Sequence, residues 1–201
     1  MTPYTFINRP AAGALYQALI RDPFYITLEN RSSPDPATAR EAMLRYYDYA
    51  MREARDHGRL TFPPDRTSGA AIWSCPLGQE QGKTLSIMKK EFIREHLGQA
   101  SLDAYEGITA FMADQAKGIV TDRFWYLSIL GLSPDCQGKG LGRELMAPVL
   151  EETDSLGVPV YAESFIPKNF NFYLRLGFKK VKTIDEPVTG TSYTILARFP
   201  G

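Results

Sequence analysis

Hydrophobic residues recur along this chain at two spacings, which predict helices in some segments and strands in others. Between Pro36 and His57 the apolar residues follow the helical repeat, Asp35 and Pro36 form a typical helix start, and Gly58 supplies the stop. The same spacing predicts further helices over residues 11–20, 79–97, 99–118, 140–156 and 168–178, the second and third of them joined at Gly98.

The remaining apolar segments are short, alternating or rich in aromatic and β-branched residues, which is typical of strands. They lie at residues 4–9, 59–64, 68–76, 124–132, 158–164, 179–185 and 192–199, the last two as a hairpin, whereas residues 24–36 look irregular. Strands and helices are mixed around a central strand–helix–strand unit, which predicts an α/β or α+β fold. No internal repeat or linker interrupts the chain, so we expect a single domain over residues 1–201.

Composition narrows the possible functions. The chain has 201 residues, 44% of them hydrophobic, and its 23 basic and 23 acidic side chains cancel, which argues against nucleic acid or an anionic membrane as partner. No segment resembles a signal peptide or a membrane span, so we expect a cytoplasmic protein. Cys75 and Cys136 suggest free thiols, and no cysteine or histidine spacing suggests a metal site.

The stretch "SPDCQGKGLGREL", residues 133–145, holds three glycines between a predicted strand and a predicted helix. A P-loop would need Gly-x-x-x-x-Gly-Lys-Ser/Thr, and a dinucleotide fingerprint would need glycine where Arg143 stands, so neither fits. A second candidate P-loop, "GQEQGKT" at 78–84, is one residue too short. Glycines at a helix start allow an anion to approach free N–H groups, so the stretch predicts a pyrophosphate site.

These residues resemble the coenzyme A-binding motif of the GNAT superfamily of N-acyltransferases, Gln/Arg-x-x-Gly-x-Gly/Ala at a strand-to-helix junction. Gln137, Gly140 and Gly142 match that motif. The resemblance continues to "PKNFNFYLRLGF", where Asn169 and Tyr173 match residues that close the acyl site. Over residues 70–178 the chain is most similar to the branch of puromycin N-acetyltransferase and its relatives, whereas the first third carries almost no identifying motif.

The resemblance implies a single-domain GNAT-like fold, with a mixed, splayed sheet flanked by helices and a helical insertion at 79–118 before the coenzyme A-binding strand. Residues 121–201 would form the acetyl-CoA-binding half and residues 1–120 the acceptor-side half. Acetyl-CoA is the implied cosubstrate. The residues implied to hold it are Leu130 and Leu132, through their backbone, and Gln137, Gly138, Lys139, Gly140, Leu141, Gly142, Asn169 and Tyr173.

Two residues are candidates for proton transfer. Glu163 ends a strand that borders the implied splay, on the face opposite Val160 and Ala162, and is a candidate general base; it could equally be a surface carboxylate or a substrate anchor. The resemblance implies that Tyr173 is the general acid for the leaving thiolate, the alternative being a core tyrosine. Asn169 lies one helical turn before Tyr173, so both side chains share a face.

The acceptor must be inferred from weaker signals. Aromatic residues in the segments at 24–25, 45–51, 62 and 73 suit a flat or apolar small molecule, and the neutral charge argues against polycations. We therefore expect a small-molecule amine of the antibiotic, toxin or secondary-metabolite type. An O-acyltransferase and a non-catalytic acyl-CoA sensor stay open as alternatives, as does the choice between monomer and homodimer.

Overall fold

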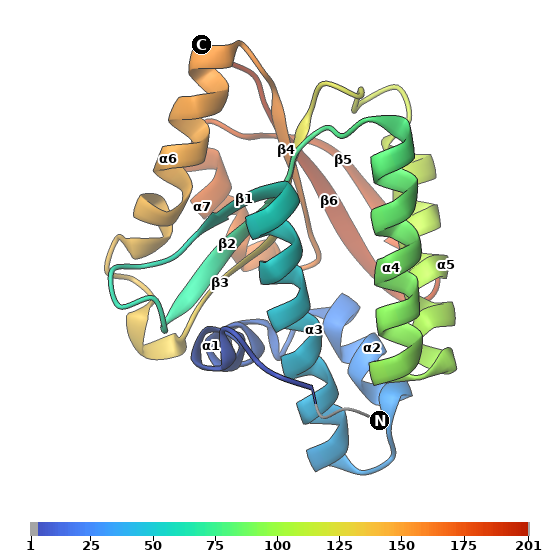
Figure 1. Cartoon of the computed structure of the whole chain (residues 1–201). Coiled ribbons are helices and arrows are strands. Elements are labelled where there is room, and N and C mark those ends of the chain that lie inside the picture. The colour runs from blue at the N-terminus through green and yellow to red at the C-terminus, as the bar shows by residue number, and fades with distance from the viewer. Residues whose placement is uncertain (1–3, 201) are drawn as a thin grey trace.

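The structure, a computed structural model, describes residues 4–200 and contains a six-stranded mixed sheet at its centre (Figure 1). The strand order is β1-β2-β3-β4-β6-β5; β3 and β4 are parallel, and all other neighbours are antiparallel. The predicted α/β class is therefore confirmed. The strands are β1 (Gly58–Thr61), β2 (Gly69–Ser74), β3 (Trp125–Leu132), β4 (Val160–Ser164), β5 (Lys179–Glu186) and β6 (Thr191–Arg198).

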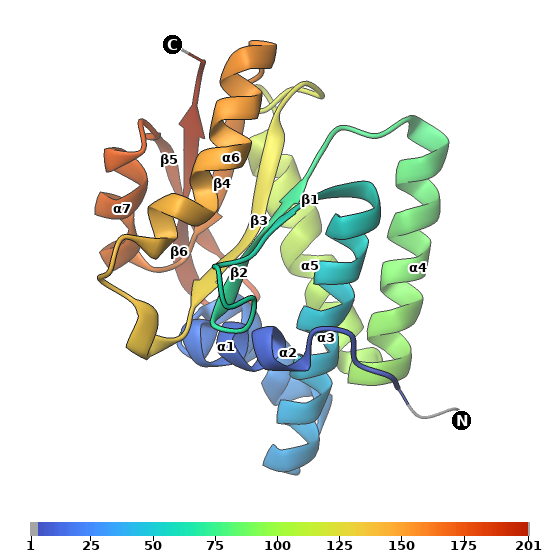
Figure 2. The same ribbon diagram turned by 60° about the vertical axis from the view of Figure 1, so that its left-hand side comes forward.

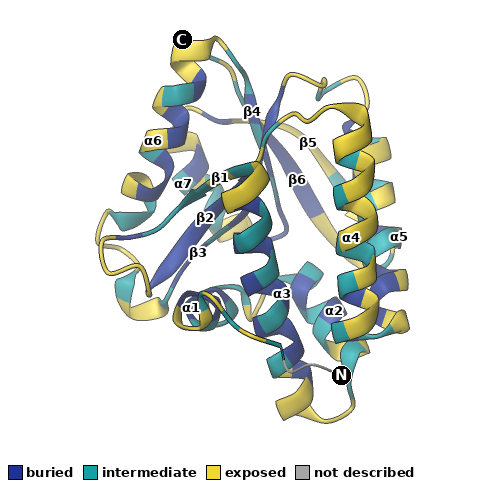
Figure 3. Cartoon of the chain, viewed as in Figure 1, coloured by how far each residue is buried: buried dark blue, intermediate teal, exposed yellow. Residues whose placement is uncertain are grey.

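Helices cover both faces of the sheet. On one face lie α6 and α7, and on the other α3, α4 and α5, with α1 and α2 crossing at the lower end of the view (Figures 1 and 2). The central strands are buried, whereas the edge strand β5 is mostly exposed (Figure 3). The helices are α1 (Arg9–Leu19), α2 (Pro23–Ser32), α3 (Pro36–His57), α4 (Gln79–Leu97), α5 (Gln99–Ala116), α6 (Leu141–Leu156) and α7 (Phe170–Arg175).

Two sequence-based predictions near the N-terminus are wrong. Residues 4–8 form no strand: the Tyr4 hydroxyl and the Asn8 N–H donate to the carboxylate of Asp48, at 2.8 and 2.6 Å, and alternate aromatic rings pack against helices. The segment expected to be irregular contains α2. Asp22 caps this helix and Pro23 occupies its first turn, the same Asp-Pro start that begins α3.

The sheet opens between its two parallel strands. β3 pairs with β4 only at Trp125–Val160, Tyr126–Tyr161 and Leu127–Ala162. Beyond these pairs β3 continues to Leu132 along β2, whereas β4 continues to Ser164 along β6. The predicted splay is therefore present, and its gap begins after Leu127 and Ala162.

Gly131 allows α1 to cross the far end of β3. A Cβ atom at this position would lie 2.9 Å from both the Leu15 Cδ2 and the Ala18 Cβ atoms of α1, closer than carbon atoms pack. The absence of a side chain therefore brings α1, and the turn that follows it, onto the open end of the splay.

We expect Gly131→Val to destabilise the protein by about 1–3 kcal/mol, because the added carbons must push α1 away from β3. Chemical denaturation would measure this as a lower unfolding midpoint. Gly13→Ala is the matched control: Gly13 lies inside α1 with nothing within 4 Å of an added Cβ, so this change should be neutral or slightly stabilising. Equal stability of the two variants would contradict the close approach at Gly131.

Candidate active site

The glycine stretch forms an exposed turn that leads into α6. The Gln137 side chain donates from Nε2 to the Leu132 carbonyl at 2.9 Å, which ties the turn to the end of β3. Gly140 has a φ of 86°, a left-handed conformation that favours glycine. The N–H groups of Leu141 and Gly142 lie in the first turn of α6 and donate to no backbone carbonyl within residues 4–200, so they are free to bind an anion.

Two cationic side chains flank this turn. Lys139 and Arg143 are exposed, and within residues 4–200 neither of them forms an ion pair. The sequence analysis selected Lys139 but treated Arg143 only as evidence against a dinucleotide motif. Free N–H groups together with two unpaired cations suit the pyrophosphate of coenzyme A.

The edge of β3 that borders the splay carries backbone groups for an extended ligand. The Ser133 N–H donates to Ser68 next to β2, so Ser133 and Gly131 point their backbone groups toward β2. Since alternate residues of a strand point in opposite directions, the backbone groups of Leu130 and Leu132 point into the splay. The Leu132 carbonyl already accepts from Gln137, which leaves Leu130 as the better-placed of the two to bind a ligand.

A cavity of about 430 Å³ occupies the splay and extends under the helices on one face of the sheet. The β3 edge, including Leu130, forms one wall, and Glu163, Asn169 and Tyr173 line it from the other side of the gap. The structure thus brings together both candidate catalytic residues and three of the residues implied to bind acetyl-CoA.

Glu163 faces into this cavity from β4, on the same side of the sheet as Tyr126 and Tyr161 of the paired strands. Its Oε1 atom is buried and accepts no hydrogen bond from any residue in the described range 4–200. Burial raises the pKa of Glu163 to about 7, and the nearby Tyr126 hydroxyl limits that rise. Glu163 can therefore gain or lose a proton near neutral pH.

Tyr173 lies on α7, where Phe172 and Phe178 pack edge-on against its ring. Burial, together with the negative charge of Asp22, raises its pKa well above the ordinary value for tyrosine. The phenol is therefore protonated at neutral pH and able to donate. Asn169, in the turn just before α7, lines the same cavity as Tyr173. Their four-residue spacing predicted that the two side chains would share a face.

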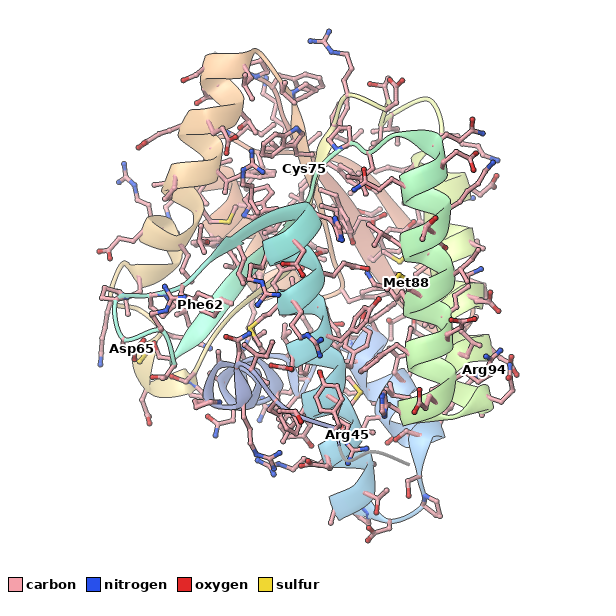
Figure 4. All side chains as sticks on the ribbon, in the orientation of Figure 1. Arg45, Phe62, Asp65, Cys75, Met88 and Arg94 are labelled. Carbon is pink, nitrogen blue, oxygen red and sulfur yellow. The ribbon has the colours of Figure 1, made fainter. Side chains whose placement is uncertain are left out.

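Helices from the predicted acceptor-side half, residues 1–120, form the outer wall of the cavity. Residues from α3, α4 and α5 line it, among them the aromatic residues Tyr46 and Tyr105, and α2 contributes Phe24. Within this wall Lys89 forms an ion pair with Glu53. Phe62 was expected to contribute, but it lies at the β1–β2 turn, on the opposite side of the molecule from α4 (Figure 4).

Part of the cavity wall lies where the chain passes from β2 to α4. Cys75 marks this place in Figure 4, between the end of α3 and the start of α4. His57, Leu77 and Gly82 line the same part of the cavity. Sequence patterns did not place these residues together, because they come from the end of α3 and the start of α4, which are separated in the chain by two strands.

Asp22 is, with Arg143, a site residue that the sequence analysis did not select. It lines the cavity from the turn between α1 and α2, whereas the sequence analysis left it between a helix predicted to end at residue 20 and a segment expected to be irregular. The Asp-Pro pair at 22–23 was the available signal, because that pair starts helices and thereby fixes where the aspartate lies. Nothing local in the sequence indicated that this turn would lie beside the splay.

Comparison with known proteins supports the resemblance to the GNAT superfamily. The model of the acetyltransferase (GNAT) domain family matches residues 76–190, more than half of the chain. The chain belongs to the GNAT family. It is an acetyl-CoA-dependent N-acetyltransferase, and the expected cosubstrate is confirmed at the level of the family. An uncharacterised N-acetyltransferase from Schizosaccharomyces pombe is 24% identical over 176 residues, which cover 85% of this chain and 70% of that relative.

Solved structures show the same GNAT fold at low sequence identity. A Corynebacterium glutamicum protein described as histone acetyltransferase HPA2 and related acetyltransferase has a TM-score of 0.61 and 18% identity, covering 99% of this chain and 94% of its own. Arylalkylamine N-acetyltransferase 2 from Aedes aegypti has a TM-score of 0.59 and 13% identity, with 98% of each chain covered. The Drosophila melanogaster polyamine N-acetyltransferase has a TM-score of 0.52 and 16% identity, covering 96% of this chain and 97% of its own.

These findings confirm the family but do not single out the puromycin branch, so that part of the resemblance stays a prediction. The roles of individual site residues and the division into halves at residues 1–120 and 121–201 also stay predictions. Among the described residues, none of the helices has the length and hydrophobicity needed to span a bilayer.

Proposed function

We propose that this GNAT protein transfers the acetyl group of acetyl-CoA directly to the amine of a small molecule with an aromatic or apolar body. The observation that carries the proposal is one continuous cavity that joins the splayed strands to an aromatic, partly acidic chamber. Its volume of about 430 Å³ suits a small molecule. Two structural neighbours, an arylalkylamine and a polyamine N-acetyltransferase, are named for small-amine acceptors, which favours this class.

The residues of the chain fit acetyl-CoA as follows. The N–H groups at Leu141 and Gly142, with Gly138, Lys139 and Gly140 of the turn, would hold the pyrophosphate. The backbone groups of Leu130, with Leu132 anchored by Gln137, would bind the pantetheine arm as a neighbouring strand would. When bound, acetyl-CoA supplies a thioester whose acetyl group is the group transferred.

Glu163 has the properties needed to remove a proton from the acceptor. An alkylamine with a pKa near 10 is about 99.9% protonated at pH 7, so freeing its lone pair costs about 4 kcal/mol. A carboxylate with a pKa of about 7, buried in the cavity and with an unpartnered oxygen, can accept that proton near neutral pH.

Two further groups can donate hydrogen bonds or protons to the thioester as it reacts. The Leu130 N–H can donate to the thioester carbonyl oxygen as negative charge develops on it. The protonated hydroxyl of Tyr173 can donate its proton to the leaving sulfur, since the buried phenol lines the same cavity. The acetyl group then passes to the amine in one step, without an enzyme-bound acyl group.

Calorimetric titration with acetyl-CoA, using ATP and NADH as controls, tests the first part of this proposal. We expect saturable binding of acetyl-CoA alone. A screen of small alkyl and aryl amines, monitored by free-thiol release and by mass spectrometry of the product, tests the second. A folded protein that does not bind acetyl-CoA, or one that acetylates only peptides, would overturn the proposal.

A further inference from the structure

Asp22 is held in the cavity by the backbone around it. Its N–H donates to the Leu19 carbonyl at the end of α1, and its own carbonyl accepts from Ile26 in α2, at 2.9 and 3.0 Å. The close approach of α1 to β3 at Gly131 fixes this turn beside the open end of the splay (Figures 1 and 2). The Asp22 carboxylate therefore has a defined place in the wall of the cavity.

The Asp22 carboxylate caps α2 but is paired with no cationic side chain of residues 4–200. Its Oδ1 atom accepts the Phe24 N–H at 3.0 Å, the usual contact of a helix cap. Within residues 4–200 no lysine, arginine or histidine forms an ion pair with it. Burial raises the pKa of Asp22 to about 6, partly offset by N–H groups of α2, so the group is mainly ionised at pH 7.5.

The other acids in the cavity differ from Asp22. Glu53 is neutralised by its ion pair with Lys89. Glu163 has a higher pKa, of about 7, and is only partly ionised at neutral pH. Asp22 is thus the acid in the cavity wall whose negative charge is balanced only by N–H groups at the start of α2 and by no cationic side chain of residues 4–200. Asp22 is half-buried, and a charge partly withdrawn from water is stabilised when an opposite charge approaches it, as a cationic ligand would.

Aromatic residues lie near the same carboxylate. Its charge contributes, after burial, to the raised pKa values of Tyr25 and Tyr173, so all three groups lie close together. Tyr25, Phe24 and Tyr173 line the cavity with it. A negative charge set among ring faces and edges is suited to an ammonium group attached to an apolar body.

We propose that Asp22 binds the ammonium group of the acceptor and so selects cationic alkylamines over neutral amines of similar shape. This inference rests on the proposed acetyl transfer and names the class of acceptor within it. Asp22 acts as a specificity-determining residue: it holds the protonated amine in the chamber, from which the proton is then removed by Glu163.

The test compares two acceptors of matched size, phenethylamine, which is cationic at pH 7.5, and 4-ethylaniline, which is neutral. In Asp22→Asn we expect kcat/KM for phenethylamine to fall about 10- to 100-fold, mostly through KM, because a charge-assisted contact is lost. The value for the aniline should change less than about 2-fold, since a neutral amine gains nothing from the charge. Asparagine caps helices as well as aspartate does, so α2 is retained.

Asp35→Asn is the matched control, because Asp35 caps α3 in the same way, with Thr38 N–H at 2.9 Å, but is exposed and outside the cavity. It should leave both acceptors unaffected, and Asp22→Glu should recover part of the preference. Equal losses for the two acceptors in Asp22→Asn, or no loss, would overturn the role of Asp22.

The same experiment separates this inference from the proposed function. A wild-type protein that acetylates 4-ethylaniline but not phenethylamine would overturn the role of Asp22 and leave small-amine acetylation intact. A wild-type protein that binds acetyl-CoA but neither acetylates nor binds any small amine would overturn both. Binding of phenethylamine to the wild type and to Asp22→Asn, measured by calorimetry without acetyl-CoA, tests the charge contact independently of turnover.

Discussion

Replacing Tyr173 by phenylalanine is expected to lower kcat by about 100- to 1,000-fold, because the leaving sulfur loses its proton donor. The change removes one hydroxyl and keeps the ring that packs between Phe172 and Phe178. Acetyl-CoA affinity should therefore change by less than about 3-fold, as the glycine turn and the β3 edge are untouched. Steady-state kinetics and calorimetry on the same preparation would measure the two quantities.

Tyr16→Phe is a suitable control for this prediction. It also removes one tyrosine hydroxyl, which donates to Glu29 at 2.6 Å, but Tyr16 lies outside the cavity. Its turnover should match that of the wild type. A Tyr173→Phe enzyme with unchanged kcat would remove Tyr173 as the acid, and a large loss of acetyl-CoA binding would show instead that its hydroxyl holds the cosubstrate.

The arrangement of the candidate acetyl-CoA residues could be predicted because its signals are local in sequence. The turn at 137–142 is a contiguous motif between a strand and a helix, and its glycines and its helix start both lie within a few residues of one another. The spacing of Asn169 and Tyr173 is likewise local, so a short helix brings both to one wall. Alternation along β4 was enough to place Glu163 opposite Val160 and Ala162.

The acceptor side depends on contacts between distant segments, which local patterns do not reveal. Asp22 reaches the cavity only because Gly131, more than a hundred residues later, lets α1 lie against β3. The wrong strand at residues 4–9 has the same origin: the alternating aromatic rings there pack on helices, and the backbone binds the buried Asp48 instead of a neighbouring strand. Position in the sequence also gave no measure of burial at Glu163, which sets its pKa.

The second large effect is expected from replacing Glu163, which should change the pH dependence of the reaction. Since burial raises its pKa to about 7, the carboxylate is protonated below that pH and cannot accept a proton. We expect kcat/KM of the wild type to rise with pH up to about 7 and then level off. Glu163→Gln should lower kcat/KM about 100-fold at pH 8, where the wild-type base is ionised, and should abolish the rise near pH 7.

The matched comparison for that profile is Asp22→Asn, the other unpaired acid of the cavity. If Asp22 only binds the ammonium, its variant keeps the rise near pH 7 set by Glu163 and loses affinity for the cationic acceptor. If the rise persisted in Glu163→Gln but disappeared in Asp22→Asn, Asp22 would be the proton acceptor and Glu163 would not. The variant in which the rise disappears would therefore identify which of the two carboxylates accepts the proton.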